Sequence, residues 1–376
     1  MSIQGRKGGS EPIAGRPSTG EPTEGMGRDG YYDAHSEYQR SVAQTGAALI
    51  DLCVAATTLP VADESYVVAD YGCSTGANSL KMVSRAISAV RARQPGIAAA
   101  ALHNDVPTND FNQLFANLMA TPDSYLDLDP PVLPLVSAVS FFQVAAPLSS
   151  VRLGMSFSAA HWLSAQPDVD VPGGFYFADA MGDTRDALGR QAASDWATFL
   201  RARRNELAPG GRLLVQMVGT NDAGQVTARR LLHAMAEVGE AMGSEGLIDL
   251  AAVDRYILPV YARTAAEAEQ PLHDDASLAA AFTIDEISVD PVPNPYLEAW
   301  RHDGDNFSYA RNYAAFVRGF TESNLRLHLF DAAGDGGPGV VDEYFNRLEA
   351  RFASNPMEDR FEDWTLTVVL ARTADS

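Results

Sequence analysis

The sequence predicts an α/β fold in which a doubly wound, mostly parallel sheet carries a helical cap insertion over one end. From residue 60, short apolar runs alternate with helical stretches, which is typical of strand–helix–strand units. After Asn221 the alternation breaks down, and two helical patterns surround the Pro-punctuated segment PVPNPYLEAW. Two late apolar segments, 282–289 and 363–372, have the pattern of strands that return to the sheet. The helical part is therefore expected to be an insertion into an α/β core.

The core elements follow in order. Residues 66–70 form a short apolar run that leads through a small-residue turn into a helix ending near Arg93. A second apolar run ends at Asp105. A helix over 185–207 stops before Pro209-Gly210-Gly211, a normal helix stop ahead of a buried strand. The remaining core strands are expected at 132–140, 151–157 and 211–219.

The first 30 residues hold eight Gly and three Pro among balanced charges, with no apolar stretch. Such a segment cannot bury enough apolar surface to order itself, and it lacks the apolar core of a signal peptide. We therefore expect a flexible tail over 1–30 and a single unit over 31–376. Its core would cover about 60–220 with late strands near 282–290 and 363–372, and its cap about 221–281 and 291–345.

Deleting residues 1–25 is expected to leave folding and turnover nearly unchanged, because this Gly- and Pro-rich segment carries no recognisable motif. Thermal unfolding and activity of the truncated protein check this. A large drop in melting temperature or in turnover would show that the tail docks on the folded unit.

The chain of 376 residues carries 49 acidic and 28 basic side chains, a formal net charge of −21. A surface this acidic repels phosphate backbones and anionic lipids, which argues against nucleic acid and membranes as partners. No apolar run approaches the roughly 20 residues that span a bilayer. With Cys53 and Cys73 alone, no disulfide framework is expected, and a reduced, cytoplasmic setting fits best.

The turn after the first strand, 70–78, reads DYGCSTGAN. An acid ends the strand, and small residues then let a ligand approach the backbone at the carboxyl edge of the sheet, where open α/β folds bind ligands. The alternative is a plain strand–helix turn that uses Gly for tightness. A Gly-rich turn alone does not decide between the two interpretations.

Asp105 ends the second strand, where a carboxylate can accept hydrogen bonds from the two hydroxyls of a ribose. A helix N-cap or loop acid is the alternative. Acids at the ends of both strands also suit a nicotinamide dehydrogenase. That fingerprint is G-x-G-x-x-G, however, whereas Gly72 and Gly76 are spaced as G-x-x-x-G, and the chain has no phosphate-binding Lys motif. Phosphate-containing cofactors are therefore disfavoured.

The segment 156–164, SFSAAHWLS, follows a further strand. The indole N–H of Trp162 can only donate, and the amide of Gln39, far upstream, donates twice, so both could hold an anion without a charge of their own. The alternatives are a core Trp and a structural His161. Other signals are missing: no H-E-x-x-H, no Cys pair at metal spacing and no G-x-S-x-G. Most Asp and Glu are interpreted as a solvated surface.

In combination these segments resemble the SABATH family of S-adenosylmethionine-dependent carboxyl and N-methyltransferases. Several separated motifs occur in order from about Gly27 onward. They are YDAHSEYQ at 32–39, DYGCSTGAN at 70–78, NDVPTNDFN at 104–112, SFF at 140–142, SFSAAHWLS at 156–164, ELAPGGR at 206–212, EGLI at 245–248 and PVY at 259–261.

The resemblance implies a class I, Rossmann-like methyltransferase with S-adenosyl-L-methionine as cofactor, a small carboxylic acid as substrate, and a homodimer. The residues implied for the cofactor are Tyr32, Ser36, Asp70, Gly72, Cys73, Asn78, Asp105, Val106, Ser140, Phe141 and Phe157. Gln39 and Trp162 are implied to hold the carboxylate. The acceptor pocket is implied to be lined by Ser158, His161, Leu231, Leu232, Tyr261, Val317 and Phe320.

The chain departs from the family pattern at several positions. His35 replaces an Asn, and Ala77 replaces the Pro of the cofactor turn. Leu232 stands where a bulky aromatic is common, which indicates a roomier pocket. The D-x-F-N motif that binds a metal in some members reads Asp254-Arg-Tyr-Ile257, without the Asn ligand, so no metal is expected.

The reaction implied needs no general base. A carboxylate with a reference pKa near 4 is already ionised at neutral pH and can attack a sulfonium methyl directly. The attacking oxygen must lie about 3 Å from the methyl carbon, in line with the sulfur. Two alternatives stay open: N-methylation of a heteroaromatic compound by the same family, and a cofactor-binding protein without turnover.

Overall fold

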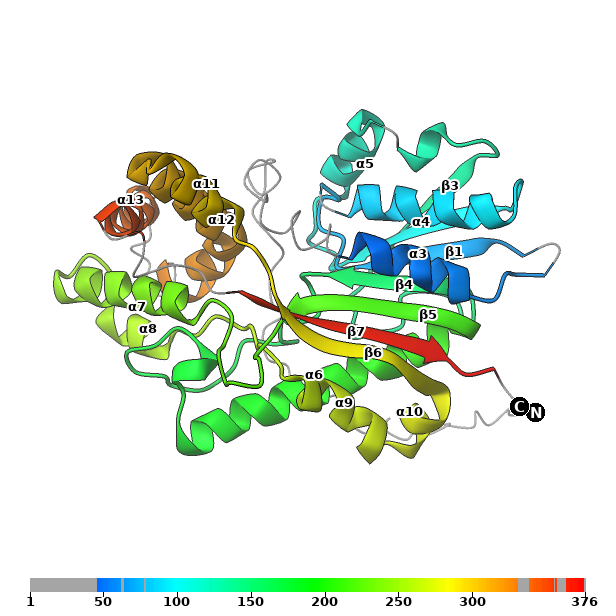
Figure 1. The fold of residues 1–376 in the computed structure, drawn as a ribbon. Helices are drawn as coiled ribbons and strands as arrows, with labels where there is room; N and C mark the ends of the chain where they lie inside the picture. Colours follow the sequence, from blue (N-terminus) through cyan, green and yellow to red (C-terminus); the bar gives the residue numbers. More distant parts are fainter. Residues whose placement is uncertain are drawn as a thin grey trace, which may run out of the picture.

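The computed structural model describes residues 46–61, 64–77, 79–122, 124–330, 338–354, 356 and 363–374. Its centre is a seven-stranded sheet with the order β3-β2-β1-β4-β5-β7-β6 (Figure 1). The strands are β1 (Tyr66–Tyr71), β2 (Ala99–Asp105), β3 (Val132–Ala138), β4 (Val151–Phe157), β5 (Leu207–Val218), β6 (Phe282–Pro291) and β7 (Trp364–Arg372).

The first five strands of the chain run parallel, and β7 is antiparallel to both β5 and β6. β1 pairs with β2 on one side and with β4 on the other, so the strand order reverses direction at β1. In an open α/β sheet this switch point leaves a crevice at the carboxyl ends of the strands, where ligands bind. The turn after β1 therefore lies at the expected binding edge.

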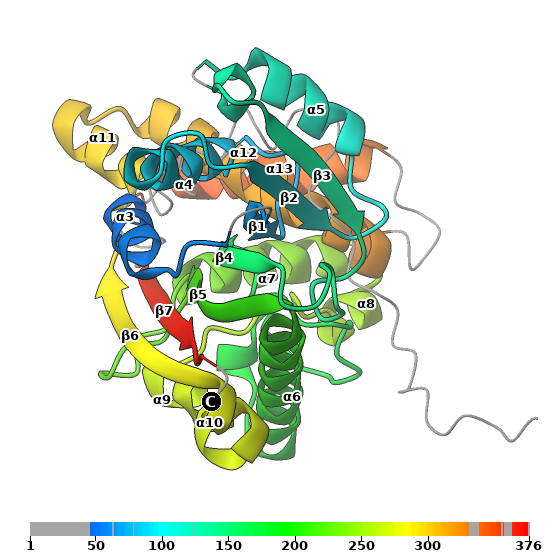
Figure 2. The ribbon, with the colours of Figure 1, turned by 90° about the vertical axis from the view of Figure 1, so that its right-hand side faces the viewer.

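Helices cover both faces of the sheet (Figures 1 and 2). On one face α3 (Ala47–Ala56), α4 (Leu80–Arg93) and α5 (Phe111–Ala120) pack on β1 and its neighbours. On the other lie α6 (Gly182–Glu206), α9 (Ala265–Asp274) and α10 (Ala276–Ala281). β4 and most of β5 are buried on both faces, as a sheet covered by two helix layers requires, and apart from Ser156 and Gln216 the buried side chains are apolar.

The other helices form a cap beside the carboxyl ends of β4 and β5 (Figure 1). A separate apolar cluster holds the cap together. Its helices are α7 (Arg229–Ser244), α8 (Leu250–Arg255), α11 (Pro295–Asp303), α12 (Asn306–Leu325), the π-helical turn Arg326–Phe330 and α13 (Pro338–Ser354). A short 3-10 turn at Phe177–Asp179 packs on the cap, and another at Tyr125–Asp127 packs on α4 instead. No helix in the described part of the chain is long and apolar enough to cross a membrane.

The predicted fold class is confirmed: a mixed α/β unit built on a doubly wound sheet. Three details differ from the expected layout. The helix α3 was not foreseen. Residues 265–281, expected in the cap, form α9 and α10, which pack against α6 and β6. The last cap helix, α13, runs to Ser354, past the expected boundary at 345. The expected tail over 1–30 lies outside the described residues.

Candidate active site

The turn between β1 and α4 lies against the end of β2. The backbone N–H groups of Gly72 and Cys73 donate to the Asn104 carbonyl at 2.8 and 3.0 Å. Gly72 and Gly76 have φ of +81° and +80°, a backbone conformation that favours glycine. A Cβ added to Gly72 would lie 2.3 Å from the Cβ of Ala159, so the turn also touches the segment after β4. These glycines are needed for conformation and for close approach.

Asp70 lies at the carboxyl end of β1 and is almost fully buried. Its Oδ2 has no hydrogen-bond partner among the described residues, and it lies 3.8 Å from Nδ1 of His103, its neighbour in the sheet register. The other ring nitrogen of His103 is 2.8 Å from the Tyr125 hydroxyl. A buried carboxylate oxygen without a partner is costly, so it marks a place where a ligand donor could bind.

Asp105, at the end of β2, accepts a hydrogen bond on each carboxylate oxygen. Oδ2 accepts from the Ser74 N–H at 2.7 Å and Oδ1 from the Val106 N–H at 2.8 Å. Burial raises the pKa of this carboxyl from 3.8 to about 6. Each oxygen still has acceptor capacity left. The contact with Ser74 places the end of β2 against the turn after β1. That these residues share one ligand stays a prediction.

Two asparagines that sequence reasoning gave no role hold the same turn. The Asn109 amide donates to the Ser74 carbonyl and the Asn117 amide to the Thr75 carbonyl, both at 2.9 Å. Asn109 belongs to the motif at 104–112, and this was the only feature of the sequence that could have indicated its role in holding the turn. Together they link α5 and the residues before it to the turn.

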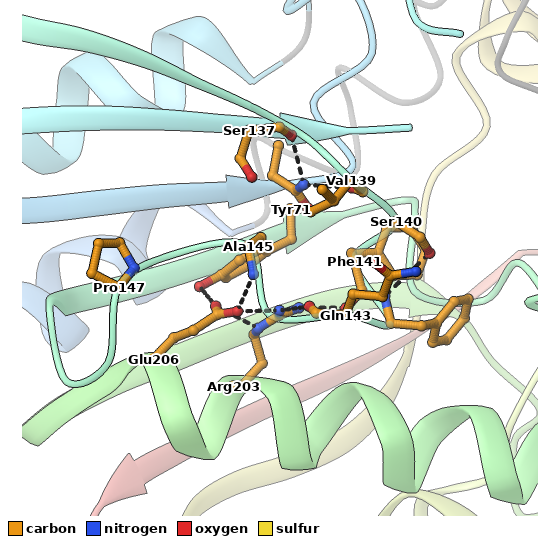
Figure 3. A network of polar contacts seen from close by, with 12 residues as sticks. Tyr71, Ser137, Val139, Ser140, Phe141, Gln143, Ala145, Pro147, Arg203 and Glu206 are labelled. Carbon is orange, nitrogen blue, oxygen red and sulfur yellow. Dashed lines mark hydrogen bonds and ion pairs between the residues drawn. The ribbon is translucent and has the colours of Figure 1, made fainter. Parts of the chain in front are cut away.

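The segment after β3 closes the site from the other side. The Asn104 amide donates to the carbonyls of Ser137 and Val139 at 2.9 and 2.7 Å (Figure 3). The Phe141 ring comes within 3.7 Å of the Cβ position built on Gly72. Phe141 and the turn are thus neighbours. That Ser140 and Phe141 contact the cofactor stays a prediction.

The segment after β4 carries the proposed anion donors. Trp162 Nε1 and His161 Nδ1 are buried, and neither has a hydrogen-bond partner in the part of the chain that the structure describes. Burial, and then the charge of Arg263, lowers the pKa of His161 to about 3. His161 is therefore neutral at physiological pH, like the indole.

Two buried side chains brace this segment. The Arg263 guanidinium donates to the Ala160 carbonyl at 3.1 Å, and the Asp195 carboxylate accepts from the Ser164 N–H at 2.9 Å and from its hydroxyl at 2.7 Å. The backbone of Trp162 pairs with Val260, at the entrance to the cap. Ser158 has a φ of +53°, so the chain turns sharply where β4 ends. Phe157 lies buried just before it, at the end of that strand.

The residues of the cap that were expected to line the acceptor pocket fall into two groups, according to what they pack against. Leu231, Leu232 and Val317 are buried in the apolar cluster of the cap, with Phe320 packed at its margin. The Tyr261 ring packs on Phe177 with 4.1 Å between ring centroids, and its hydroxyl donates to Glu267 at 2.7 Å. The polar end of Tyr261 is thus engaged with α9.

Tyr32, Ser36, Gln39 and Asn78 lie outside the described residues. In place of the D-x-F-N motif, the Tyr256 hydroxyl donates to Asn324 at 2.7 Å and the Ile257 carbonyl accepts from Gln166 at 2.7 Å. Across the described ranges no group of three or more His, Cys, Asp or Glu could hold a metal. The absence of a metal stays a prediction.

The chain is similar to several known proteins over most of its length. Jasmonate O-methyltransferase of Arabidopsis thaliana is 26% identical over 359 residues, which cover 84% of this chain and 89% of that protein. Salicylate carboxymethyltransferase of Clarkia breweri is 26% identical over 326 residues, 82% of this chain and 85% of that protein.

A solved structure of loganic acid methyltransferase with SAH superposes with a TM-score of 0.76 at 23% identity, covering 93% of this chain and 99% of that one. It shows the same fold. The family model described as SAM-dependent carboxyl methyltransferase matches residues 19–373. The resemblance drawn from the motifs is therefore confirmed, and this chain belongs to the family of S-adenosylmethionine-dependent carboxyl methyltransferases.

Proposed function

We propose that this protein converts a small-molecule carboxylic acid to its methyl ester, with S-adenosylmethionine as the methyl donor. Family membership supports the reaction class. The observation that carries the choice of acceptor is the buried Trp162 N–H, which has no partner among the described residues. A buried neutral donor gains most from an anionic acceptor, because charge-assisted hydrogen bonds are the stronger ones.

The residues at the ends of β1 and β2 fit the cofactor. S-adenosylmethionine supplies an electrophilic methyl group on a positively charged sulfur. Asp70 and Asp105 place two carboxylates at adjacent strand ends, and one of them has an oxygen without a partner in the described structure. We propose that Asp105 holds the ribose and that Ser140 and Phe141 lie against the adenosine. The proposed cofactor set also includes Val106 and Phe157, and Tyr32, Ser36 and Asn78 beyond the described residues.

The neutral donors orient the substrate. We propose that Trp162 and Gln39 bind one carboxylate oxygen and leave the other free to attack. A strong salt bridge to the same carboxylate would reduce its nucleophilicity, whereas neutral donors hold its direction. Most of the rate acceleration then comes from alignment of the attacking oxygen. His161 is neutral, so it can contact the acid without acting as a cationic partner.

We propose an acceptor pocket made of the segment after β4 and of the cap. Its members are Ser158, His161, Leu231, Leu232, Val317 and Phe320. Tyr261 belongs to the same proposed set, with its hydroxyl bound to Glu267 and its ring packed on Phe177. Aliphatic walls suit an acid with an apolar body.

Cofactor affinity is expected to fall in acid. Burial raises the pKa of Asp105 to about 6, so the carboxyl gains a proton as the pH falls through that value. Ribose hydroxyls bind the ionised form better, so affinity is present above about pH 6 and lost below it. The dissociation constant of S-adenosylhomocysteine should rise roughly tenfold between about pH 7 and pH 5. Calorimetry of Asp105→Asn should show no such dependence, and a persisting dependence would point to another group.

Incubation with a panel of small acids and neutral N-heterocycles, followed by mass spectrometry, tests the proposed reaction. Methyl esters are the expected products. Methylated heterocycles without any ester would replace this proposal by the N-methyltransferase alternative, and binding of cofactor without any product would favour a non-catalytic role. We also propose a homodimer, supported by family membership, and a cytoplasmic location, supported by the two free cysteines.

A further inference from the structure

The last turn of α6 carries an ion pair that is completely buried. Arg203 Nη2 lies 2.8 Å from Glu206 Oε1, and neither side chain has any exposed surface. A second bond joins Arg203 Nε to Glu206 Oε2 at 2.9 Å, so the pair is bidentate. Removing two charges from water costs several kcal/mol, and an apolar pair often packs at least as well. Stability alone is therefore a weak reason for this pair.

The pair holds the loop between β3 and β4 at three points. Arg203 donates to the carbonyls of Phe141 at 2.8 Å and Gln143 at 3.0 Å. Glu206 Oε1 accepts from the Ala145 N–H at 2.6 Å. Figure 3 shows the guanidinium and the carboxylate side by side beneath this loop. All three bonds are to backbone atoms, so they fix the path of the loop.

The same pair also holds the end of β1. The Tyr71 hydroxyl donates to Glu206 Oε2 at 2.5 Å, and the guanidinium carbon of Arg203 lies 3.8 Å from the centre of the Tyr71 ring. Tyr71 directly precedes Gly72, the first glycine of the cofactor turn. Burial raises the pKa of Tyr71 well above its usual range, so the hydroxyl keeps its proton and stays a donor.

We propose that Arg203 and Glu206 are positioning residues for cofactor binding, which set Ser140 and Phe141 at the correct distance from the Gly72 turn. The inference rests on the proposed placement of the adenosine between these two segments. The two segments are far apart in sequence, and the pair connects them through five bonds or ring contacts. Loosening it should open the adenosine site without touching the acceptor donors at 161–162.

Two conservative variants test the pair. Arg203→Lys keeps the charge but lacks the planar fork that bonds Glu206 twice and both carbonyls at once. Glu206→Gln keeps an acceptor for Ala145 but loses the charge. The matched control is Trp196→Phe, which removes a buried bond from the same helix to the Ala268 carbonyl but keeps an aromatic ring on Phe199. All melting temperatures should fall, because each change leaves a buried group without its partner.

Calorimetry with S-adenosylhomocysteine and with adenosine, well below each melting temperature, separates positioning from stability. We expect dissociation constants of both ligands to rise about tenfold in the two variants, which corresponds to about 1.4 kcal/mol, and not in Trp196→Phe. The KM for the cofactor should rise alongside, while kcat at saturating cofactor stays within about twofold. Hydrogen exchange of the 139–147 segment should become faster.

The milder Tyr71→Phe keeps the test available if the ion-pair variants do not fold. It removes only the hydroxyl, and a roughly threefold rise in both dissociation constants is expected. Unchanged affinities in folded variants would overturn the positioning role while leaving the reaction intact. Loss of affinity for S-adenosylhomocysteine without loss for adenosine would overturn it as well. Failure of the wild-type protein to esterify any acid would count against the proposed function instead.

Discussion

Replacing Asp105 by alanine is expected to raise the dissociation constant of S-adenosylhomocysteine roughly 10- to 100-fold, because the ribose hydroxyls lose a charged acceptor worth about 1.5–3 kcal/mol. The structure adds a second reason. The N–H groups of Ser74 and Val106 both donate to this carboxylate, so its removal also loosens the turn after β1. Isothermal calorimetry on the folded variant measures the effect.

Two further variants sharpen this test. Asp105→Asn keeps one acceptor oxygen and should lose less affinity than the alanine variant. Asp110→Asn, at the N-cap of α5, keeps its cap to Gln113 because asparagine caps as well as aspartate does, and it should bind normally. A folded Asp105→Ala protein with wild-type affinity would remove the ribose assignment.

Trp162→Phe and Gln39→Ala are each expected to lower kcat/KM for the ester product roughly 10- to 100-fold, since a donor to an anion is worth about 1.5–3 kcal/mol. Both kcat and KM should suffer, because the acid must be held in one direction in the ground state and in the transition state. Affinity for S-adenosylhomocysteine should stay nearly unchanged. Steady-state kinetics on an acid identified from the panel provides the measurement.

The control for Trp162→Phe is Trp300→Phe. This variant removes an indole N–H that donates to Asn306 in the cap, and Trp300 is far from the proposed carboxylate donors in the sequence. It should leave turnover near the wild-type value. If Trp162 and Gln39 hold the same carboxylate, the double variant should lose less than the sum of the two single losses. Full activity of Trp162→Phe on every acid would rule out the indole as a carboxylate donor.

Much of the fold could be predicted because its strands are strongly patterned. The apolar runs at 66–70, 99–105 and 151–157 are buried on both faces, and each one is a strand of the sheet. The helix α3 gave no comparable signal. Its N-cap residue is Gly46, which has no side chain to cap the helix, and it has no acidic residue in its first turn or basic residue in its last. Its apolar sequence therefore did not distinguish a helix from other buried structure.

At the site, the sequence could predict what strand ends and motifs place together. Asp105 contacts the turn after β1, and Phe141 lies against Gly72. The ion pair of Arg203 and Glu206 could not be foreseen in the same way. Arginine and acidic side chains near the end of a helix are usually interpreted as part of its solvated surface. Only the tertiary structure shows that Arg203 and Glu206 are both fully buried. The role of the Tyr261 hydroxyl depends likewise on α9, which packs on α6.

The position of β7 has a consequence for synthesis of the chain. β7 lies between β5 and β6, although it follows both in the sequence. During translation β5 therefore keeps an open edge, and β6 has no strand to pair with, until residues 364–372 have left the ribosome tunnel. Open edges of nascent sheets recruit other chains. The nascent protein should thus depend on holding chaperones until β7 has emerged, and stalled chains that lack β7 should be degraded or aggregate.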